Sequence, residues 1–162
     1  MKISGRVMRL GDDVDTDVIF PARYLAILDW QEQSKHVFEA LGDDMPAKVR
    51  RFPVIAAGWN LGCGSSREQA VTGLVGADVK LVIAKSFARI FFRNAINNGL
   101  AVIESPALVD ALKEGDEVSV DLASGDASVN GSTVHFAPLP SFLQRILQQG
   151  GMWASLPRTE NA

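Results

Sequence analysis

Three short apolar runs, separated by two amphipathic stretches, constrain the fold of this chain more than any other feature. The runs cover Pro53–Ala57, Val79–Ala84 and Leu100–Ile103, and each is the length of a buried strand. The stretches between them carry apolar residues near helical spacing, and they end at Gly76 and Gly99. Strands that alternate with helices over short links are typical of a parallel sheet. The centre of the chain therefore predicts an α/β core.

The two flanks of this core predict further strands. Ile3–Leu10 alternates loosely and predicts a first strand, while Glu117–Leu122 alternates strongly and is followed by a turn sequence. Ser128–Ala137 predicts more short strands, and Pro140–Gln149 predicts a closing helix with apolar residues on one side. We therefore expect a parallel α/β core with an antiparallel β extension.

Between the first strand and the core, the sequence is less regular. The spacing predicts a helix across Gln33–Leu41. Gly42–Phe52 is polar and is interrupted by Pro46, which predicts a loop.

Composition limits the class of protein. The 162 residues predict a single domain, 1–162, and 47% hydrophobic content is sufficient for a sizeable core. A formal net charge of −3 argues against a nucleic-acid partner. No apolar run approaches the roughly 18 residues of a membrane span. Cys63 is the one cysteine, and no apolar signal segment opens the chain, so we expect a cytoplasmic protein without disulfides.

A glycine-rich loop lies where the first central strand gives way to a helix, the usual place for ligands in open α/β sheets. The loop ends in Gly64-Ser65-Ser66-Arg67. A dinucleotide fingerprint requires glycine in place of Arg67, and a P-loop requires a lysine before the serine. The serine-hydrolase elbow also fails, because Ser65 follows Gly64 and precedes Ser66 directly. These named loops are therefore excluded.

Two interpretations of the Ser65–Arg67 segment remain open at the level of the sequence. Two serines and an arginine at a helix N-terminus suit a bound carboxylate, because backbone N–H groups and a guanidinium favour an anion. Alternatively, Ser65 and Glu68 form an S-x-x-E capping box and Arg67 is solvated. The glycines beside Cys63 favour the first interpretation, since they let a ligand approach the backbone. Ser86 is expected to cap the following helix in the same way.

The chain offers no metal-ligand spacing. An iron–sulfur cluster needs several thiolates, about four in the common types, and Cys63 stands alone. His36 and His135 are isolated as well. We therefore expect no metal on this chain, and any metal that takes part belongs to another chain.

Three segments, in order, resemble the isopropylmalate isomerase small subunits of the aconitase family. Asp15–Leu25 is similar to the family's TD-x-I-x-P-A-R-[YF]-L signature, and Gly62–Glu68 and Ala84–Asn94 match two further motifs. The matched region spans Asp12–Leu100, over half of the chain, and the short length is similar to that of archaeal-type small subunits. The resemblance implies the swivelling β/β/α domain of aconitase, here as a free subunit.

The activity that this resemblance implies is that of a hydro-lyase of leucine biosynthesis. It interconverts 2-isopropylmalate and 3-isopropylmalate by dehydration and rehydration. A large subunit, in a heterodimer or heterotetramer, would carry a [4Fe–4S] cluster, and this chain would carry no cofactor. By analogy with aconitase, Ser65 is the base, Ser66 and Arg67 bind a substrate carboxylate, and Cys63 is a loop residue. The isolated subunit is expected to be inert.

The resemblance also implies a substrate-specificity segment, formed by Tyr24, Leu25, Ala26 and Ile27. Homoaconitases have an arginine after Tyr-Leu to meet an extra carboxylate, and here that position is Ala26. Apolar residues suit an isopropyl group and cannot pair a carboxylate. The alternative is that Leu25, Ile27 and Leu28 are ordinary core or partner-interface residues.

Four other motif residues have two interpretations each. Thr16 and Asp17 either shape the floor of the site or form a turn. Arg89 and Arg93, one helical turn apart, either face the large subunit or belong to a solvated helix face.

Three rival functions are retained. The nearest is the small subunit of a homoaconitase, or of a citraconate- or dimethylmalate-type dehydratase, on the same scaffold. The second is a non-catalytic module that binds an anion at Ser65–Arg67. The third is a self-contained enzyme with Cys63 as nucleophile.

Overall fold

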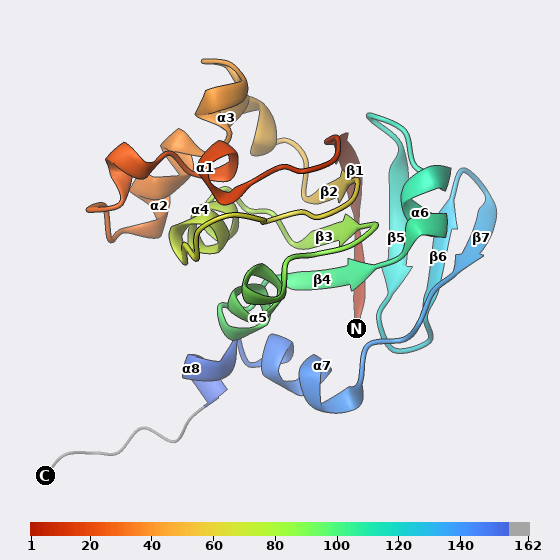
Figure 1. The fold of residues 1–162 in the computed structure, drawn as a ribbon. Coiled ribbons are helices and arrows are strands. Elements are labelled where there is room, and N and C mark those ends of the chain that lie inside the picture. The colour runs from red at the N-terminus through yellow and green to blue at the C-terminus, as the bar shows by residue number, and fades with distance from the viewer. Residues whose placement is uncertain (156–162) are drawn as a thin grey trace, which may run out of the picture.

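The computed structural model describes residues 1–155, and one seven-stranded sheet forms its centre (Figure 1). The predicted single domain, 1–162, extends past these residues and stays a prediction. The order of the strands across the sheet is β4-β3-β2-β1-β5-β6-β7. The strands are β1 (Lys2–Arg9), β2 (Val54–Ala57), β3 (Leu81–Ala84), β4 (Ala101–Glu104), β5 (Glu117–Asp121), β6 (Asp126–Val129) and β7 (Ser132–His135).

The first half of the sheet is parallel. β2 pairs with β3, and β3 pairs with β4, so that Val54 lies opposite Leu81 and Leu81 opposite Ala101. Every residue of β2 and β3 is buried, as continuous apolar runs in a covered parallel sheet require. The predicted α/β core is confirmed.

The second half of the sheet is antiparallel. β5 pairs with β1 and β6, and β6 pairs with β7. Buried Val118 and Val120 alternate with exposed Glu117 and Ser119 along β5, which agrees with the alternation in the sequence. The predicted antiparallel extension is therefore confirmed.

Strand β1 joins the two halves, because each of its ends has a different partner. Lys2–Arg6 runs antiparallel to β5, while Val7–Arg9 runs parallel to β2.

Helices cover the sheet on its two sides (Figure 1). The short helix α6 packs against both β3 and β7, although four strands separate these two in the sheet. The sheet therefore curls around α6. The helices are α1 (Thr16–Ile19), α2 (Trp30–Gln33), α3 (Met45–Val49), α4 (Gln69–Gly76), α5 (Arg89–Asn97), α6 (Pro106–Ala111), α7 (Ser141–Gln148) and α8 (Met152–Ser155). Within residues 1–155, no helix is long and apolar enough to cross a membrane.

The helix predicted across Gln33–Leu41 is wrong. Helix α2 ends at Gln33, and two 3-10 turns follow, Ser34–His36 and Glu39–Leu41. Phe38 stands between the turns with a φ of 59°, in the left-handed region that no continuous helix contains. Its side chain is buried in the core, so tertiary packing overrides the local spacing.

The loop predicted for Gly42–Phe52 is also wrong, because it contains α3. Pro46 lies in the first turn of α3, where a proline breaks no hydrogen bond and fixes a suitable φ. A proline at this position favours a helix start rather than a loop.

Both predicted caps are wrong. Helix α4 begins at Gln69, and Ser65 lies outside it in the preceding loop. The Glu68 carboxylate accepts a hydrogen bond from Asn98 Nδ2 at 3.1 Å instead of closing a capping box. Helix α5 begins at Arg89, and Ser86 Oγ accepts a hydrogen bond from the backbone N–H of Asn60.

Candidate functional site

Three loops meet at the edge of the sheet where β1, β2 and β3 end. These strands are parallel, so the loops 10–15, 58–68 and 85–88 leave the sheet on the same side. The middle loop pairs with both neighbours: Gly62 N–H donates to Val14 C=O at 2.8 Å, and Leu61 N–H donates to Ser86 C=O at 3.0 Å. The glycine-rich loop therefore has a fixed backbone path between its neighbours.

Gly62 fixes the distance between this loop and α5. Its φ is +78°, and a Cβ atom there would lie 2.3 Å from Cγ of Phe91. No side chain fits in that space, so Gly62 lets the Phe91 ring pack directly against the loop backbone. The sequence suggested that the glycines of this loop let a ligand approach the backbone. At Gly62 the ring of Phe91 takes that place instead.

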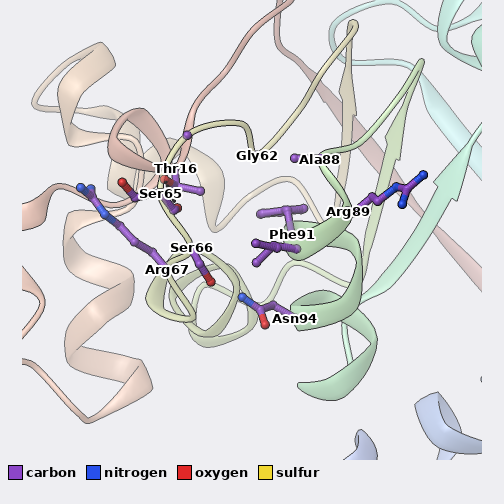
Figure 2. A pocket seen from close by; sticks show the side chains of 11 residues that line it. Thr16, Gly62, Ser65, Ser66, Arg67, Ala88, Arg89, Phe91 and Asn94 are labelled. Atoms are coloured by element: carbon purple, nitrogen blue, oxygen red, sulfur yellow. Dashed lines mark hydrogen bonds between the residues drawn. The ribbon is translucent and has the colours of Figure 1, made fainter.

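A pocket of about 220 Å³ opens between the loop and α5 (Figure 2). It brings together four of the predicted site residues, which are Thr16, Ser65, Ser66 and Arg67. Its remaining walls come from the glycine-rich loop, from the residue before α5 and from α5 itself, and they are formed by Gly62, Gly64, Ala88, Arg89, Ile90, Phe91 and Asn94.

Thr16 holds the backbone of Ser65. Its side chain is buried, and its Oγ1 donates to the backbone C=O of Ser65 at 2.8 Å. The hydroxyl of Ser65 makes no helix cap and stays exposed. The peptide is therefore fixed while the hydroxyl is accessible to a ligand.

Arg67 is oriented by α1. Its Nη1 lies 2.6 Å from Asp17 Oδ1 and 3.3 Å from the backbone C=O of Phe20. The hydrogen bond from Arg67 holds the pKa of the Asp17 carboxyl below its usual value. The Arg67 side chain is only 15% exposed, so the alternative of a solvated arginine is wrong. A guanidinium has five N–H donors, and Nε and Nη2 have no protein partner within residues 1–155.

Several walls of the pocket were not predicted as site residues. Ile90, Phe91 and Asn94 lie on one side of α5 at helical spacing, and they face the Ser65–Arg67 loop. The helical spacing of these residues within the third motif could have identified them as pocket residues. That inference would also have needed the packing of α5 beside the loop, which the sequence does not show.

Arg89 borders the pocket, but its side chain points away from the centre (Figure 2). Arg89 and Arg93 line a neighbouring hollow with Phe87, Phe92 and Glu104, and both arginines are exposed. Both interpretations of these arginines, contact with the large subunit and a solvated helix face, therefore stay open.

The predicted specificity segment lies outside this pocket. The Tyr24 ring stacks on His36 at a centroid distance of 3.6 Å, and its hydroxyl donates to Glu39 Oε1 at 3.0 Å. Leu25 C=O accepts a hydrogen bond from Gln69 Nε2 at 3.2 Å, which places the segment beside the start of α4. Ala26 is exposed and Ile27 is half-buried.

Cys63 has the wrong electrostatic environment for a nucleophile. Burial, followed by the charges of Asp15 and Asp13, raises the pKa of its thiol. The thiol therefore stays protonated at neutral pH, which disfavours the cysteine-enzyme alternative. Within residues 1–155, no group of three or more His, Cys, Asp or Glu side chains is arranged to hold a metal ion.

Comparison with known proteins gives consistent results. Residues 13–108 match the aconitase C-terminal domain. The chain is 47% identical over 154 residues to the 3-isopropylmalate dehydratase small subunit of Thermodesulfovibrio yellowstonii, covering 94% of this chain and 92% of that protein. It is 47% identical over 152 residues to the Methanosarcina acetivorans small subunit, covering 93% of each. The crystal structure of a 3-isopropylmalate dehydratase from Methanocaldococcus jannaschii superposes with a TM-score of 0.87 at 43% identity, covering 95% of this chain and 92% of that one.

Proposed function

Because this chain belongs to the 3-isopropylmalate dehydratase small subunits, hydro-lyases with the aconitase C-terminal fold, we propose that its Ser65–Arg67 pocket is half of an active site. The other half belongs to a large subunit, which the small-subunit family implies as the partner. The pair interconverts 2- and 3-isopropylmalate in leucine biosynthesis. The predicted family and swivelling α/β fold are confirmed.

The observation that supports this proposal is the pairing of an accessible hydroxyl with an oriented guanidinium. Ser65 and Arg67 line the same pocket, and both are fixed by α1, through Thr16 and Asp17. A carboxylate that binds the free edge of Arg67 in a bidentate manner places its α-carbon near the loop. The predicted floor residues Thr16 and Asp17 thus act by holding Ser65 and Arg67.

In the proposed reaction, Ser65 takes the proton from the carbon next to a carboxylate that Arg67 and Ser66 bind. Loss of water then gives an alkene, and water adds back in the opposite sense, which moves the hydroxyl group to the neighbouring carbon. The positive charge of Arg67 stabilises the negative charge that develops on the carboxylate.

This chain does not fit an iron–sulfur cluster, because Cys63 is its one cysteine and its thiol is protonated. We assign the [4Fe–4S] cluster that the family resemblance implies to the large subunit.

Energetics make the partner necessary. A serine hydroxyl has a pKa close to that of water, far above neutral. Deprotonating it fully at pH 7 takes on the order of 12 kcal/mol. A helix terminus supplies at most about 2 kcal/mol, and Ser65 lies outside α4. The remainder would come from Arg67, a closed and dry site and the partner's charges, or the deprotonation is confined to the transition state. The isolated subunit is therefore expected to be inactive.

Substrate preference is proposed to depend on Tyr24, Leu25, Ala26 and Ile27. The segment lies beside the start of α4, and Ala26 is exposed. We expect Ala26→Arg to add activity on homocitrate-type substrates, because arginine would pair the extra carboxylate. An unchanged preference would assign the segment to packing or to the subunit interface.

The first experiment is the isomerisation of 3-isopropylmalate by the anaerobically co-purified pair, beside each subunit alone. We expect activity only in the pair. Ser65→Ala should lower kcat by about 10²- to 10⁴-fold while the complex still forms. A cluster-loaded complex that converts only another malate-like acid would change the substrate, and a complex with no activity would favour the anion-binding module.

A further inference from the structure

Asn94, in α5, and Asn98, directly after α5, lie one helical turn apart, and their side chains have different environments. Asn98 is buried, and its amide donates to Glu68 Oε1 at 3.1 Å and to the backbone C=O of Asn94 at 2.9 Å. The Asn94 side chain lies on the pocket wall and has no hydrogen-bond partner within residues 1–155. The amide that connects the end of α5 to the loop before α4 is therefore that of Asn98.

The free amide of Asn94 faces the catalytic loop. In Figure 2 the Asn94 amide and the Ser66 hydroxyl point toward one another from facing walls of the pocket. The Arg67 guanidinium points to the far side of the loop, where it contacts Asp17, and Phe91 lies on the α5 wall of the pocket. The Ser66 hydroxyl and the Asn94 amide thus face each other from the two walls of the pocket.

In the proposed reaction Ser66 and Arg67 bind one substrate carboxylate, and the two oxygens of a carboxylate accept about four hydrogen bonds. An amide N–H beside the Ser66 hydroxyl is a further donor for such an oxygen, and a charged acceptor makes each bond stronger. On the basis of the proposed function, we infer that Asn94 is a further substrate-binding residue: its Nδ2 donates, together with Ser66, to a substrate carboxylate.

A purely structural role predicts a different response to substitution. If Asn94 only held the loop through the Ser66 hydroxyl, an isosteric aspartate could accept the same hydrogen bond and function would persist. If Asn94 donates to a carboxylate, aspartate places two negative charges together and binding is lost. Alanine has a higher helix propensity than asparagine, so Asn94→Ala is not expected to unfold α5.

The test uses the assembled pair in the Ser65→Ala background, where turnover stops and binding can be measured directly. Calorimetry with 3-isopropylmalate gives the Kd for the parent pair and for added Asn94→Ala or Asn94→Asp. We expect Asn94→Ala to raise Kd by about tenfold and Asn94→Asp by about a hundredfold. The matched control is Asn97→Asp, the same change on the same helix in the groove beside α7, which should change Kd by less than about twofold.

With Ser65 intact, we expect the Asn94 variants to raise KM more than they lower kcat, at an unchanged melting temperature of the pair. Binding by Asn94→Asp that equals the parent, or a fall in melting temperature without a change in Kd, would overturn the inference. If the wild-type pair is active and the Ser65→Ala pair is equally active, only the proposed role of Ser65 is overturned. Absence of binding by the parent pair would overturn the proposed function and the inference together.

Discussion

The parallel half of the sheet, β1–β4, and the antiparallel half, β5–β7, meet at strand β1 but differ in what they contribute to the candidate site. The candidate site is built from loops that leave β1, β2 and β3, and its pocket contains no residue of the antiparallel half. The antiparallel half contributes buried residues such as Val118, Val120 and Leu122 to the same core.

This difference separates function from stability within one continuous sheet. Parallel strands end at one edge, so they bring loops from distant parts of the sequence together. Antiparallel hairpins return the chain locally and supply packing. Substitutions in the first half should therefore alter catalysis, and those in the second should alter the free energy of unfolding.

The largest expected effect is that of Arg67→Ala. Removal of the guanidinium leaves the Asp17 carboxylate without its cation, and in the proposed function the substrate carboxylate loses the same cation. We expect kcat/KM of the pair to fall by about 10²- to 10³-fold, with an unchanged melting temperature. Arg67→Lys keeps the charge but not the bidentate geometry, so it should recover only part of the loss. Full activity of Arg67→Ala would remove this half from catalysis.

Leu122→Ala is the corresponding change in the antiparallel half. Leu122 is fully buried after β5, and truncation of a buried leucine costs about 2 to 5 kcal/mol of unfolding free energy. Chemical denaturation should show this loss, while KM of the folded pair stays constant. Ser128→Ala on the exposed side of β6 is the control and should change neither quantity. A raised KM in Leu122→Ala would contradict the claim that the antiparallel half affects stability and not catalysis.

Asp17→Asn sharpens the comparison inside the site. The asparagine cannot fix Arg67 as an ion pair does, so we expect KM to rise by about tenfold. Arg67 lowers the pKa of Asp17 from an ordinary value of 3.8, so the ionised form, and the orienting contact, are present above that value and are lost as the pH falls through the lowered pKa. The KM ratio of variant to wild type should therefore stay constant between about pH 5 and pH 8. A ratio that changes with pH in that range would assign the effect to another group.

The smallest effect is expected for His135→Ala. His135 Nδ1 lies 2.6 Å from Asp126 Oδ1 on the exposed surface of the antiparallel half, and the hydrogen bond from His135 lowers the pKa of Asp126. Exposed pairs of this kind add little to stability. We expect the denaturation midpoint and the activity of the pair to match those of the wild type at pH 7. A clear loss of activity would place a function in this half.

The sequence predicts the strands well because their signals are local. Val79–Ala84 and Glu117–Leu122 carry burial in their own residue types, as a continuous run and as an alternation. The failures depend on distant residues. Glu68 does not close a capping box, because Asn98 offers its carboxylate a partner thirty positions away. The left-handed Phe38 is held by core packing that no local pattern records.

The same division applies to the site. Ser65 and Arg67 could be found from one loop motif, and the structure adds the Asp17 contact that orients Arg67. Asn94 could not, because its place on the pocket wall follows from the packing of α5 against a loop that lies about thirty residues earlier in the chain. The role of Tyr24 as an anchor on His36 was likewise invisible, since it depends on a fold between them that spacing does not encode.

The shared strand β1 also determines in which order the molecule can assemble during synthesis. Ser4 and Ser119, hydrogen-bonded neighbours on β1 and β5, are 115 positions apart in the chain. Translation adds about 5 to 20 residues per second, so the first residues wait several seconds for their partner strand to leave the ribosome. Contacts that close a loop of this length form late. We therefore expect β1–β4, with the loops of the candidate site, to collapse first, and the β5–β7 hairpins to close the nascent domain last.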